Sequence, residues 1–108
     1  MKNFRTYQLA KELFHSLKHV KVKGAMYDQL DRASLSIVLN LAEGSAKTGL
    51  KDRRKFFVIA MGSLREVQAI MDILNNKEML TKIDRVAACL HKLIQTPGPG
   101  PWARSLRP

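Results

Sequence analysis

Two groups of residues in this sequence have the side-chain types that catalysis or metal binding uses. Cys89 could act as a nucleophile, but it lies in an apolar helical stretch with no acid–histidine pair beside it, so a packed thiol is the better interpretation. His15 and His19 are four residues apart, which is the spacing of a metal-ligand pair on one helix face. No third ligand lies at a helical spacing and neighbouring lysines would repel a cation, so surface histidines are favoured.

The segment GSAKTG, residues 44–49, has two glycines and a lysine and invites comparison with a phosphate-binding loop. It lacks both the spacing of a P-loop and the strand that precedes one. No catalytic constellation remains, so we expect a protein without enzymatic activity, cofactor, metal or small-molecule substrate.

The charge balance indicates a partner more clearly than these groups do. Among 108 residues, 19 lysines and arginines face 9 aspartates and glutamates, which gives a net charge of +10. A domain this basic attracts polyanions, nucleic acid first and anionic membrane second. The alternative is a basic surface that serves only solubility. Aromatic residues make up only 6% of the chain, so contact with backbone phosphates is favoured over stacking on bases.

Hydrophobic periodicity predicts an all-α fold, because four segments show the i, i+3, i+4, i+7 pattern and none alternates like a strand. The expected helices span residues 6–18, 25 to 42 or 43, 52–75 and 81–95. Asp52 is expected to cap the third helix or lie in its first turn, and Thr81 to cap the fourth. Phe56 and Ile59 begin the core stripe of the third helix. Short connections between the four helices favour an antiparallel up-down-up-down bundle.

The bundle is expected to form a single domain over residues 1–95, followed by a basic tail over residues 96–108. The tail alternates proline and glycine, which excludes a helix and favours disorder. Cys89 is the only cysteine, so no internal disulfide can form and a reducing compartment fits. The N-terminus lacks the apolar core of a signal peptide, and no window reaches the ~18 apolar residues of a membrane span. We expect a cytoplasmic protein with no membrane partner.

The second predicted helix is apolar over much more than one stripe. One side supplies core residues such as Ile37 and Leu41, and an adjoining side carries a further apolar set: Leu35, Val38, Leu39 and Ala42. A helix apolar on so many sides must be buried by more than its own small bundle, so this set is expected to form an oligomer interface. In the third helix, Gly62 costs roughly 1 kcal/mol against alanine, and a close backbone contact would explain its presence.

In an up-down bundle the N-terminus, the loop between the second and third helices, and the C-terminus lie at the same end. That end is expected to gather the candidate nucleic-acid-binding residues: Lys2, Arg5, Lys47, Lys51, Arg53, Arg54 and Lys55. The run KDRRK alone is typical of a solvated face, but the charges around it make a polyanion-binding surface the better prediction. A smaller group of lysines is expected at the opposite end: Lys18, Lys21, Lys23, Lys77 and Lys82.

Two linked motifs in the middle of the chain resemble those of a known family. The first, RA-x-x-S-I-x-x-N-x-A-E-G, is met by Arg32, Ala33, Ser36, Ile37, Asn40, Ala42, Glu43 and Gly44. The second, F-x-x-A-x-G-S-x-x-E, is met by Phe57, Ala60, Gly62, Ser63 and Glu66. Over roughly residues 3–95 the chain resembles the four-helix-bundle proteins encoded within intervening sequences of bacterial 23S rRNA genes. Those proteins are related to the accessory variability determinant of diversity-generating retroelements. The tail and a shortened first connector depart from the family pattern.

The resemblance implies a homopentamer in which bundles pack side by side around a central pore, and it implies no enzymatic activity. In the retroelement branch it implies binding to a reverse transcriptase and to nucleic acid through a basic surface. The leading hypothesis is therefore a nucleic-acid-binding accessory protein, with a reverse transcriptase as a potential partner. The alternative is an oligomeric protein-interaction scaffold, encoded in an rRNA intervening sequence, with no nucleic-acid role.

Three residues of the first motif interrupt an otherwise apolar run. Asn40 and Glu43 stand at the end of a polar stripe and would be unfavourable to bury without partners. A structural interpretation pairs Glu43 with Arg32, Arg65 or an arginine of a neighbouring subunit, while Gly44 ends the helix. A functional interpretation has the three residues contact a partner. We favour the structural one, because Gly44 lies where a helix stop is needed.

Overall fold

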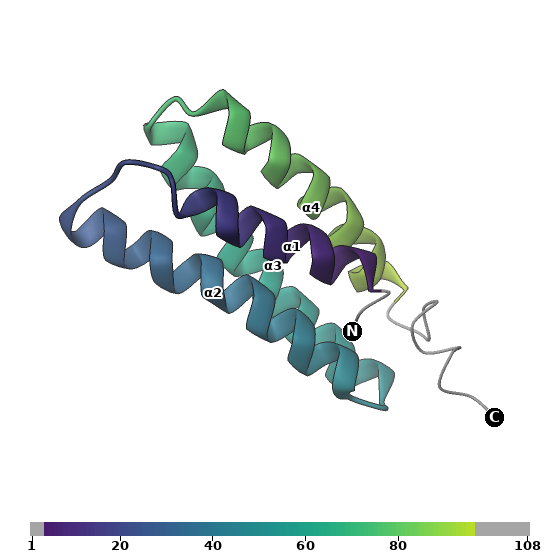
Figure 1. The fold of residues 1–108 in the computed structure, drawn as a ribbon. Coiled ribbons are helices and arrows are strands. Elements are labelled where there is room, and N and C mark those ends of the chain that lie inside the picture. Colours follow the sequence, from purple (N-terminus) through teal and green to yellow (C-terminus); the bar gives the residue numbers. More distant parts are fainter. Residues whose placement is uncertain (1–3, 97–108) are drawn as a thin grey trace.

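The computed structural model describes residues 4–96, and these form four helices and no strand (Figure 1). The helices are α1 (Arg5–Leu17), α2 (Gly24–Ala46), α3 (Leu50–Ile73) and α4 (Lys77–Gln95). The predicted all-α class is therefore confirmed. None of these four helices is long and apolar enough to cross a membrane. Beyond Thr96, the expected tail lies outside the described residues.

The four helices lie side by side, and each packs against two others (Figure 1). α2 and α3 share the most extensive contact, α4 packs against α3, and α1 packs against both α2 and α4. The α1–α2 and α3–α4 connections lie together at what we call the connector end, defined by residues 18–23 and 74–76. The α2–α3 loop, residues 47–49, lies at the opposite end, which we call the loop end. The start of α1 and the end of α4 lie at the loop end too.

An apolar core between the helices is filled by side chains from all four of them, such as Leu13, Ile37, Leu64 and Leu90. The start of α3 differs from its predicted orientation. Phe57 is fully buried, whereas Phe56 is half-buried and Ile59 is exposed. Phe57 lies three residues before Ala60 and seven before Leu64, so it belongs to the same helix face as these two buried residues.

The second helix is longer than predicted, and this changes the role of Gly44. α2 continues through Gly44 to Ala46, so Gly44 does not end the helix as predicted. Gly44 is buried, and a Cβ atom placed on it would lie 2.6 Å from Cε1 of Phe57. A glycine is therefore needed where α2 approaches α3. The loop shrinks to residues 47–49, and Asp52 lies in the first turn of α3.

The fourth helix begins earlier than predicted because a different residue caps it. Asn76 accepts a hydrogen bond at Oδ1 from the backbone N–H of Met79, with an N···O distance of 3.0 Å. α4 therefore starts at Lys77, and Thr81 lies inside the helix, where its hydroxyl donates to the Lys77 carbonyl at 3.1 Å. The predicted cap at Thr81 is wrong, because Asn76 supplies an equivalent side-chain oxygen just over one turn earlier.

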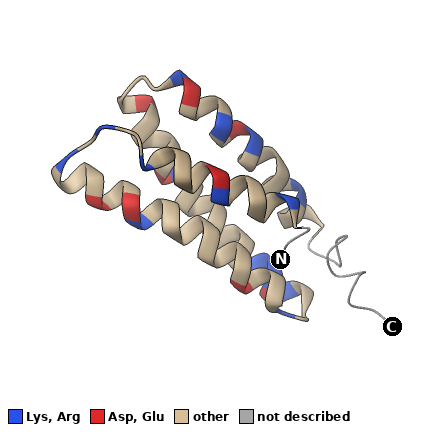
Figure 2. Cartoon of the chain, viewed as in Figure 1, with Lys and Arg blue, Asp and Glu red and all other residues tan. Residues whose placement is uncertain are grey.

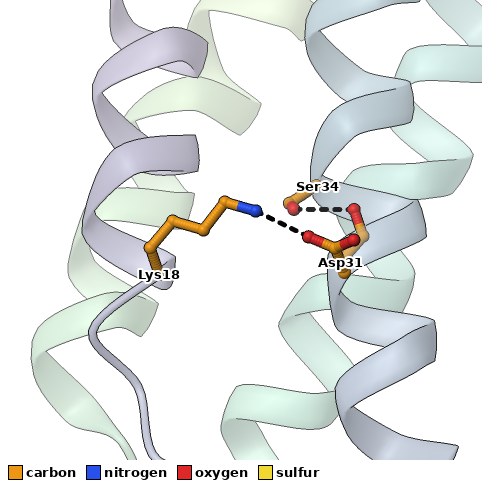
Figure 3. Close-up of polar contacts among 3 residues, drawn as sticks. All are labelled: Lys18, Asp31 and Ser34. Atoms are coloured by element: carbon orange, nitrogen blue, oxygen red, sulfur yellow. Dashed lines mark hydrogen bonds and ion pairs between the residues drawn. The ribbon is translucent and has the colours of Figure 1, made fainter.

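An ion pair ties α1 to α2 near the connector end (Figure 3). The ammonium nitrogen of Lys18 lies 2.6 Å from Oδ1 of Asp31, and Ser34 Oγ donates to the Asp31 carbonyl at 3.1 Å. The hydrogen bond to Asp31 raises the pKa of Lys18. Both side chains of the pair are nearly half exposed, so it positions the chain leaving α1 more than it stabilises the fold.

Candidate nucleic-acid interface

The loop end gathers cations from several helices (Figure 2). Arg5 is the first residue of α1, and Lys47 follows α2 directly. The first two turns of α3 then carry Lys51, Arg53, Arg54 and Lys55. Lys92, in the last turn of α4, lies at the same end and was not predicted to lie there. The predicted up-down bundle places the end of its fourth helix at this end, so the predicted topology could have indicated Lys92. The structure thus places the described members of the predicted cluster at one end, while Lys2 lies outside the described residues.

These charges lie where a helix already carries positive potential. The unpaired N–H groups at the start of an α-helix are equivalent to about half a positive unit charge. Acidic residues are favoured at that position, yet residues 51–55 carry four cations and a single acid, Asp52. The cations therefore repel both one another and the helix end. A bound anion would relieve this repulsion and be attracted by the side chains and the helix together.

Phe56 lies close to two of the lysines. The ammonium nitrogens of Lys47 and Lys55 are 5.3 and 5.9 Å from the centroid of its ring. Phe56 is half-buried, so its predicted place in the core stripe is only partly correct. The loop end therefore combines an aromatic ring with its positive charge.

Two arginines of the cluster make hydrogen bonds that hold the fold together. Arg53 is only 8% exposed, and its Nε donates to the Lys47 carbonyl at 2.8 Å, which fastens the α2–α3 loop. This burial argues against the phosphate contact predicted for Arg53. Arg54 is exposed, and its Nε donates to the Ile94 carbonyl at 3.0 Å, which links α3 to the end of α4. The exposed lysines on either side of the two arginines are the better candidates for phosphate contacts.

The connector end also carries lysines, but they alternate with acids (Figure 2). Lys18 is paired with Asp31, while Asp72 and Glu78 lie near the adjoining ends of α3 and α4. Nearby carboxylates cancel part of the positive potential at this end. The loop end is therefore the better surface for an extended polyanion.

The polar residues of the first motif form a hydrogen-bonded cluster between α2 and α3. The hydroxyl oxygens of Ser36 and Ser63 lie 2.7 Å apart. Asn40 donates through Nδ2 to both the carbonyl and the hydroxyl of Ser36, at 2.9 and 3.0 Å. These half-buried groups form hydrogen bonds with one another, which supports the predicted structural role of both Asn40 and Ser63.

Glu43 does not make the pairs predicted for it within the chain. Its carboxylate lies 3.7 Å from the Lys47 ammonium, one turn further along, and its side chain is 60% exposed. Arg32 is exposed, and Arg65 donates instead to Oε1 of Gln68 at 2.9 Å. The predicted burial of Glu43 is wrong for the single chain, because the residue lies on the outer side of α2.

Replacing Glu43 by alanine should therefore lower the free energy of unfolding by less than about 1 kcal/mol, because exposed i, i+4 ion pairs contribute little. Asn40→Ala is the comparison variant and should cost about 1–2 kcal/mol, since it removes two hydrogen bonds from half-buried groups. Urea unfolding of both variants measures the difference. A loss of several kcal/mol from Glu43→Ala would contradict the exposed position and point to an arginine of a second subunit as its partner.

Apolar side chains remain exposed on α2 and α3. On α2, Leu35 is 44% and Leu39 is 54% exposed. On α3 the exposed large apolar residues are Leu50, Val58, Ile59 and Ile73. Val38 and Ala42 are half-buried, and Val38 packs against the core of its own chain, so the predicted interface on α2 narrows mainly to the two leucines.

Gly62 makes no close approach inside the described part of the chain, because a Cβ atom placed on it meets no heavy atom within 4 Å. The close contact that its presence suggested is therefore absent from the single bundle. Gly62 lies on the exposed side of α3, one turn from Val58 and from Glu66, which are exposed as well. A helix of a second molecule could still pack closely against α3 at Gly62.

Within residues 4–96, no group of three or more His, Cys, Asp and Glu side chains is placed to hold a metal ion. Cys89 is a free, half-buried thiol in α4.

A family model described as 23S rRNA-intervening sequence protein matches residues 3–95. No curated protein and no solved structure matches the chain. The matched region includes all four helices and most of the 108 residues. The chain therefore belongs to the family of 23S rRNA-intervening sequence proteins.

Proposed function

We propose that this protein is a non-enzymatic accessory protein that binds the phosphate backbone of nucleic acid at its loop end. The observation that carries the proposal is the positive charge concentrated at the start of α3, where Lys51 and Lys55 are exposed on either side of the two structural arginines. Contact with phosphates alone positions a strand without reading its bases, so both RNA and DNA are expected ligands. The single cysteine fits a reducing cytoplasm as the place of action. A reverse transcriptase is the protein partner that the resemblance to the retroelement branch suggests.

In this proposal the up-down-up-down bundle is the subunit of a ring-shaped homopentamer. The exposed leucines of α2 and the exposed large apolar residues of α3 support an interface between copies. Gly62, on the exposed side of α3, leaves room for a neighbouring helix. Five copies would repeat the loop-end cations around one axis, and linked sites bind a polyanion far more tightly than one site does.

Leu39→Lys should weaken the assembly strongly, because it places a charge where the proposed interface removes an exposed leucine from water. Light scattering coupled to size exclusion should show a wild-type species several times the 12.2 kDa chain and a smaller species for the variant. Lys23→Glu, a charge change on an exposed residue between α1 and α2, is the control and should leave the assembly intact. A wild-type monomer at micromolar concentration would refute the oligomer.

Fluorescence anisotropy with labelled single-stranded RNA and DNA over a salt series tests the nucleic-acid role. Binding that weakens steeply with salt supports it, because each neutralised phosphate releases condensed counterion. The competing function is an oligomeric interaction scaffold, and the exposed leucines of α2 favour it. If the oligomer forms but neither RNA nor DNA binds at about 50 mM salt, the scaffold function is favoured over nucleic-acid binding.

A further inference from the structure

A cavity at the connector end lies apart from the loop-end cations. It has a volume of about 580 Å³ and is bordered by the chain leaving α1 and by the first turns of α4. Small-molecule sites in proteins have volumes of roughly 300–1,000 Å³, so this cavity is large enough for one. None of the residues of the two family motifs lines it.

Basic residues from α4 and from the chain leaving α1 line the cavity. Lys82 extends from α4 towards α1, where its ammonium donates to Ser16 Oγ at 3.2 Å. His19 and Lys21, on the chain leaving α1, also line the cavity and are exposed. Against these groups the lining has one carboxylate, that of Glu78. Two lysines, a histidine and a serine line this one cavity, and their donor groups suit a compact anion such as a phosphate.

Both sides of the cavity are held in place by hydrogen bonds. The N–H groups of His19 and Val20 donate back to carbonyls in the last turn of α1 at 3.1 Å. The ion pair between Lys18 and Asp31 fastens the start of the same segment to α2 (Figure 3). On the other side, Asn76 donates its N–H to a carbonyl of α3 at 2.9 Å and caps α4 with its side chain. A site built in this way needs little ordering when a ligand binds.

The rest of the lining indicates what the anion is attached to. Val20, Leu74 and Met79 give it an apolar part, and Met79 is buried while the other two are half-buried. A bare phosphate would leave this apolar part and most of the volume unfilled. Asn76 and Glu78 add an amide and a carboxylate, which can pair with hydroxyl or amino groups. A nucleotide has the matching parts: a phosphate, ribose hydroxyls and a planar base.

We propose that this cavity binds a nucleoside 5′-monophosphate, either as a free nucleotide or as the phosphorylated 5′ end of a strand. The phosphate lies between Lys21 and Lys82, and the base lies against the apolar part of the lining. The site shares no residue with the loop-end cations, so the tests of this site and of the function proposed above are independent of each other.

Titration of the full-length protein with adenosine 5′-monophosphate, followed by two-dimensional ¹H–¹⁵N NMR, tests the site. Amide signals of residues around the cavity should shift at lower nucleotide concentrations than those at the start of α3, where only the phosphate has a binding partner. Inorganic phosphate alone and adenosine alone should each bind about tenfold more weakly or worse, because each supplies only part of the contacts.

Lys82→Ala should weaken the binding of the nucleotide about tenfold or more, as expected for the loss of a charged hydrogen-bond donor to phosphate. Lys21→Ala should weaken nucleotide binding to a similar extent. Because Lys21 is exposed, this variant should fold and can test the site even if Lys82→Ala unfolds. Lys23→Ala removes an equal charge nearby but outside the lining, and should change affinity by less than about twofold. Unchanged spectra at millimolar nucleotide, or equal losses from Lys23→Ala and Lys82→Ala, would overturn the proposal.

A short oligonucleotide with a 5′-phosphate, compared with the same oligonucleotide carrying a 5′-hydroxyl, separates the two sources of the ligand. Tighter binding of the phosphorylated strand that disappears in Lys82→Ala identifies the strand end as the ligand. Equal binding of the two strands, with adenosine monophosphate still held by Lys21 and Lys82, identifies the free nucleotide.

Discussion

Replacing Lys51 and Lys55 together by glutamate should weaken the binding of single-stranded RNA and DNA by about tenfold or more at low salt. Both lysines are exposed in the first two turns of α3, where the helix end adds positive potential. Each substitution removes a cation that can contact a phosphate and adds a carboxylate that repels one. In an assembly every subunit carries the change, so the loss of avidity would be larger than for one copy.

The salt dependence distinguishes lost phosphate contacts from other causes of weaker binding. Each phosphate neutralised on a single strand contributes roughly −0.7 to the slope of log affinity against log salt. The Lys51→Glu/Lys55→Glu variant should therefore give a shallower slope than the wild type. Its thermal unfolding should stay close to that of the wild type, because neither side chain is buried. Arg53 is left unchanged in this variant, since it is buried and holds the α2–α3 loop.

The matched control reverses two exposed lysines at the connector end, Lys23→Glu with Lys77→Glu. It changes the net charge by the same amount but leaves the loop end untouched. At about 0.15 M salt the Debye length is ~8 Å, so charges at the far end of the bundle are largely screened from the loop end. Equal losses in the two double variants would mean that the bound strand responds only to net charge, which would refute a site at the loop end.

The helices were predictable from the sequence, because each buried face repeats at helical spacing over several turns. The helix ends were harder, since they depend on contacts between helices. A glycine after an apolar run usually marks a stop, and only the position of Phe57 shows why Gly44 lies inside α2. Asn76 and Thr81 are both good capping residues, and the sequence analysis chose Thr81, whereas Asn76 caps the helix.

The loop-end cations were predictable because four of them lie within residues 51–55 and therefore at the same end of one helix. The burial of Arg53 was missed, although Arg53 lies four residues before Phe57 and seven before Ala60, on the same helix face as the core. That spacing is the signal that could have found it. The connector-end cavity could not be predicted, because residues 16–21 and 74–82 border it from distant parts of the chain.

Gly44→Ala should lower the free energy of unfolding by about 1–3 kcal/mol, because the added methyl group overpacks a closely packed contact. Its Cβ would lie 2.6 Å from Cε1 and 2.9 Å from Cδ1 of Phe57. The Phe57 ring is fully buried and packs near Phe4, with ring centroids 6.4 Å apart, so it cannot swing into solvent. For a domain of this size each kcal/mol shifts Tm by about 4–8 °C, so thermal unfolding followed by circular dichroism resolves the effect.

Gly62→Ala is the matched control, since it adds the same methyl group on α3 where nothing in the same chain lies within 4 Å. Because Gly62 lies in the proposed interface between copies, both glycine variants are compared in the Leu39→Lys background, which is expected to dissociate the assembly. Alanine favours the helix by roughly 1 kcal/mol over glycine, so the control should unfold at the same temperature or higher. The double variant Gly44→Ala/Phe57→Leu isolates the contact, because leucine lacks the ring atoms that the new Cβ would meet. In the Phe57→Leu background, Gly44→Ala should lower the free energy of unfolding by about 1 kcal/mol or more less than it does in the wild type. An equal loss in both backgrounds would mean that α2 needs Gly44 for a reason other than its approach to Phe57.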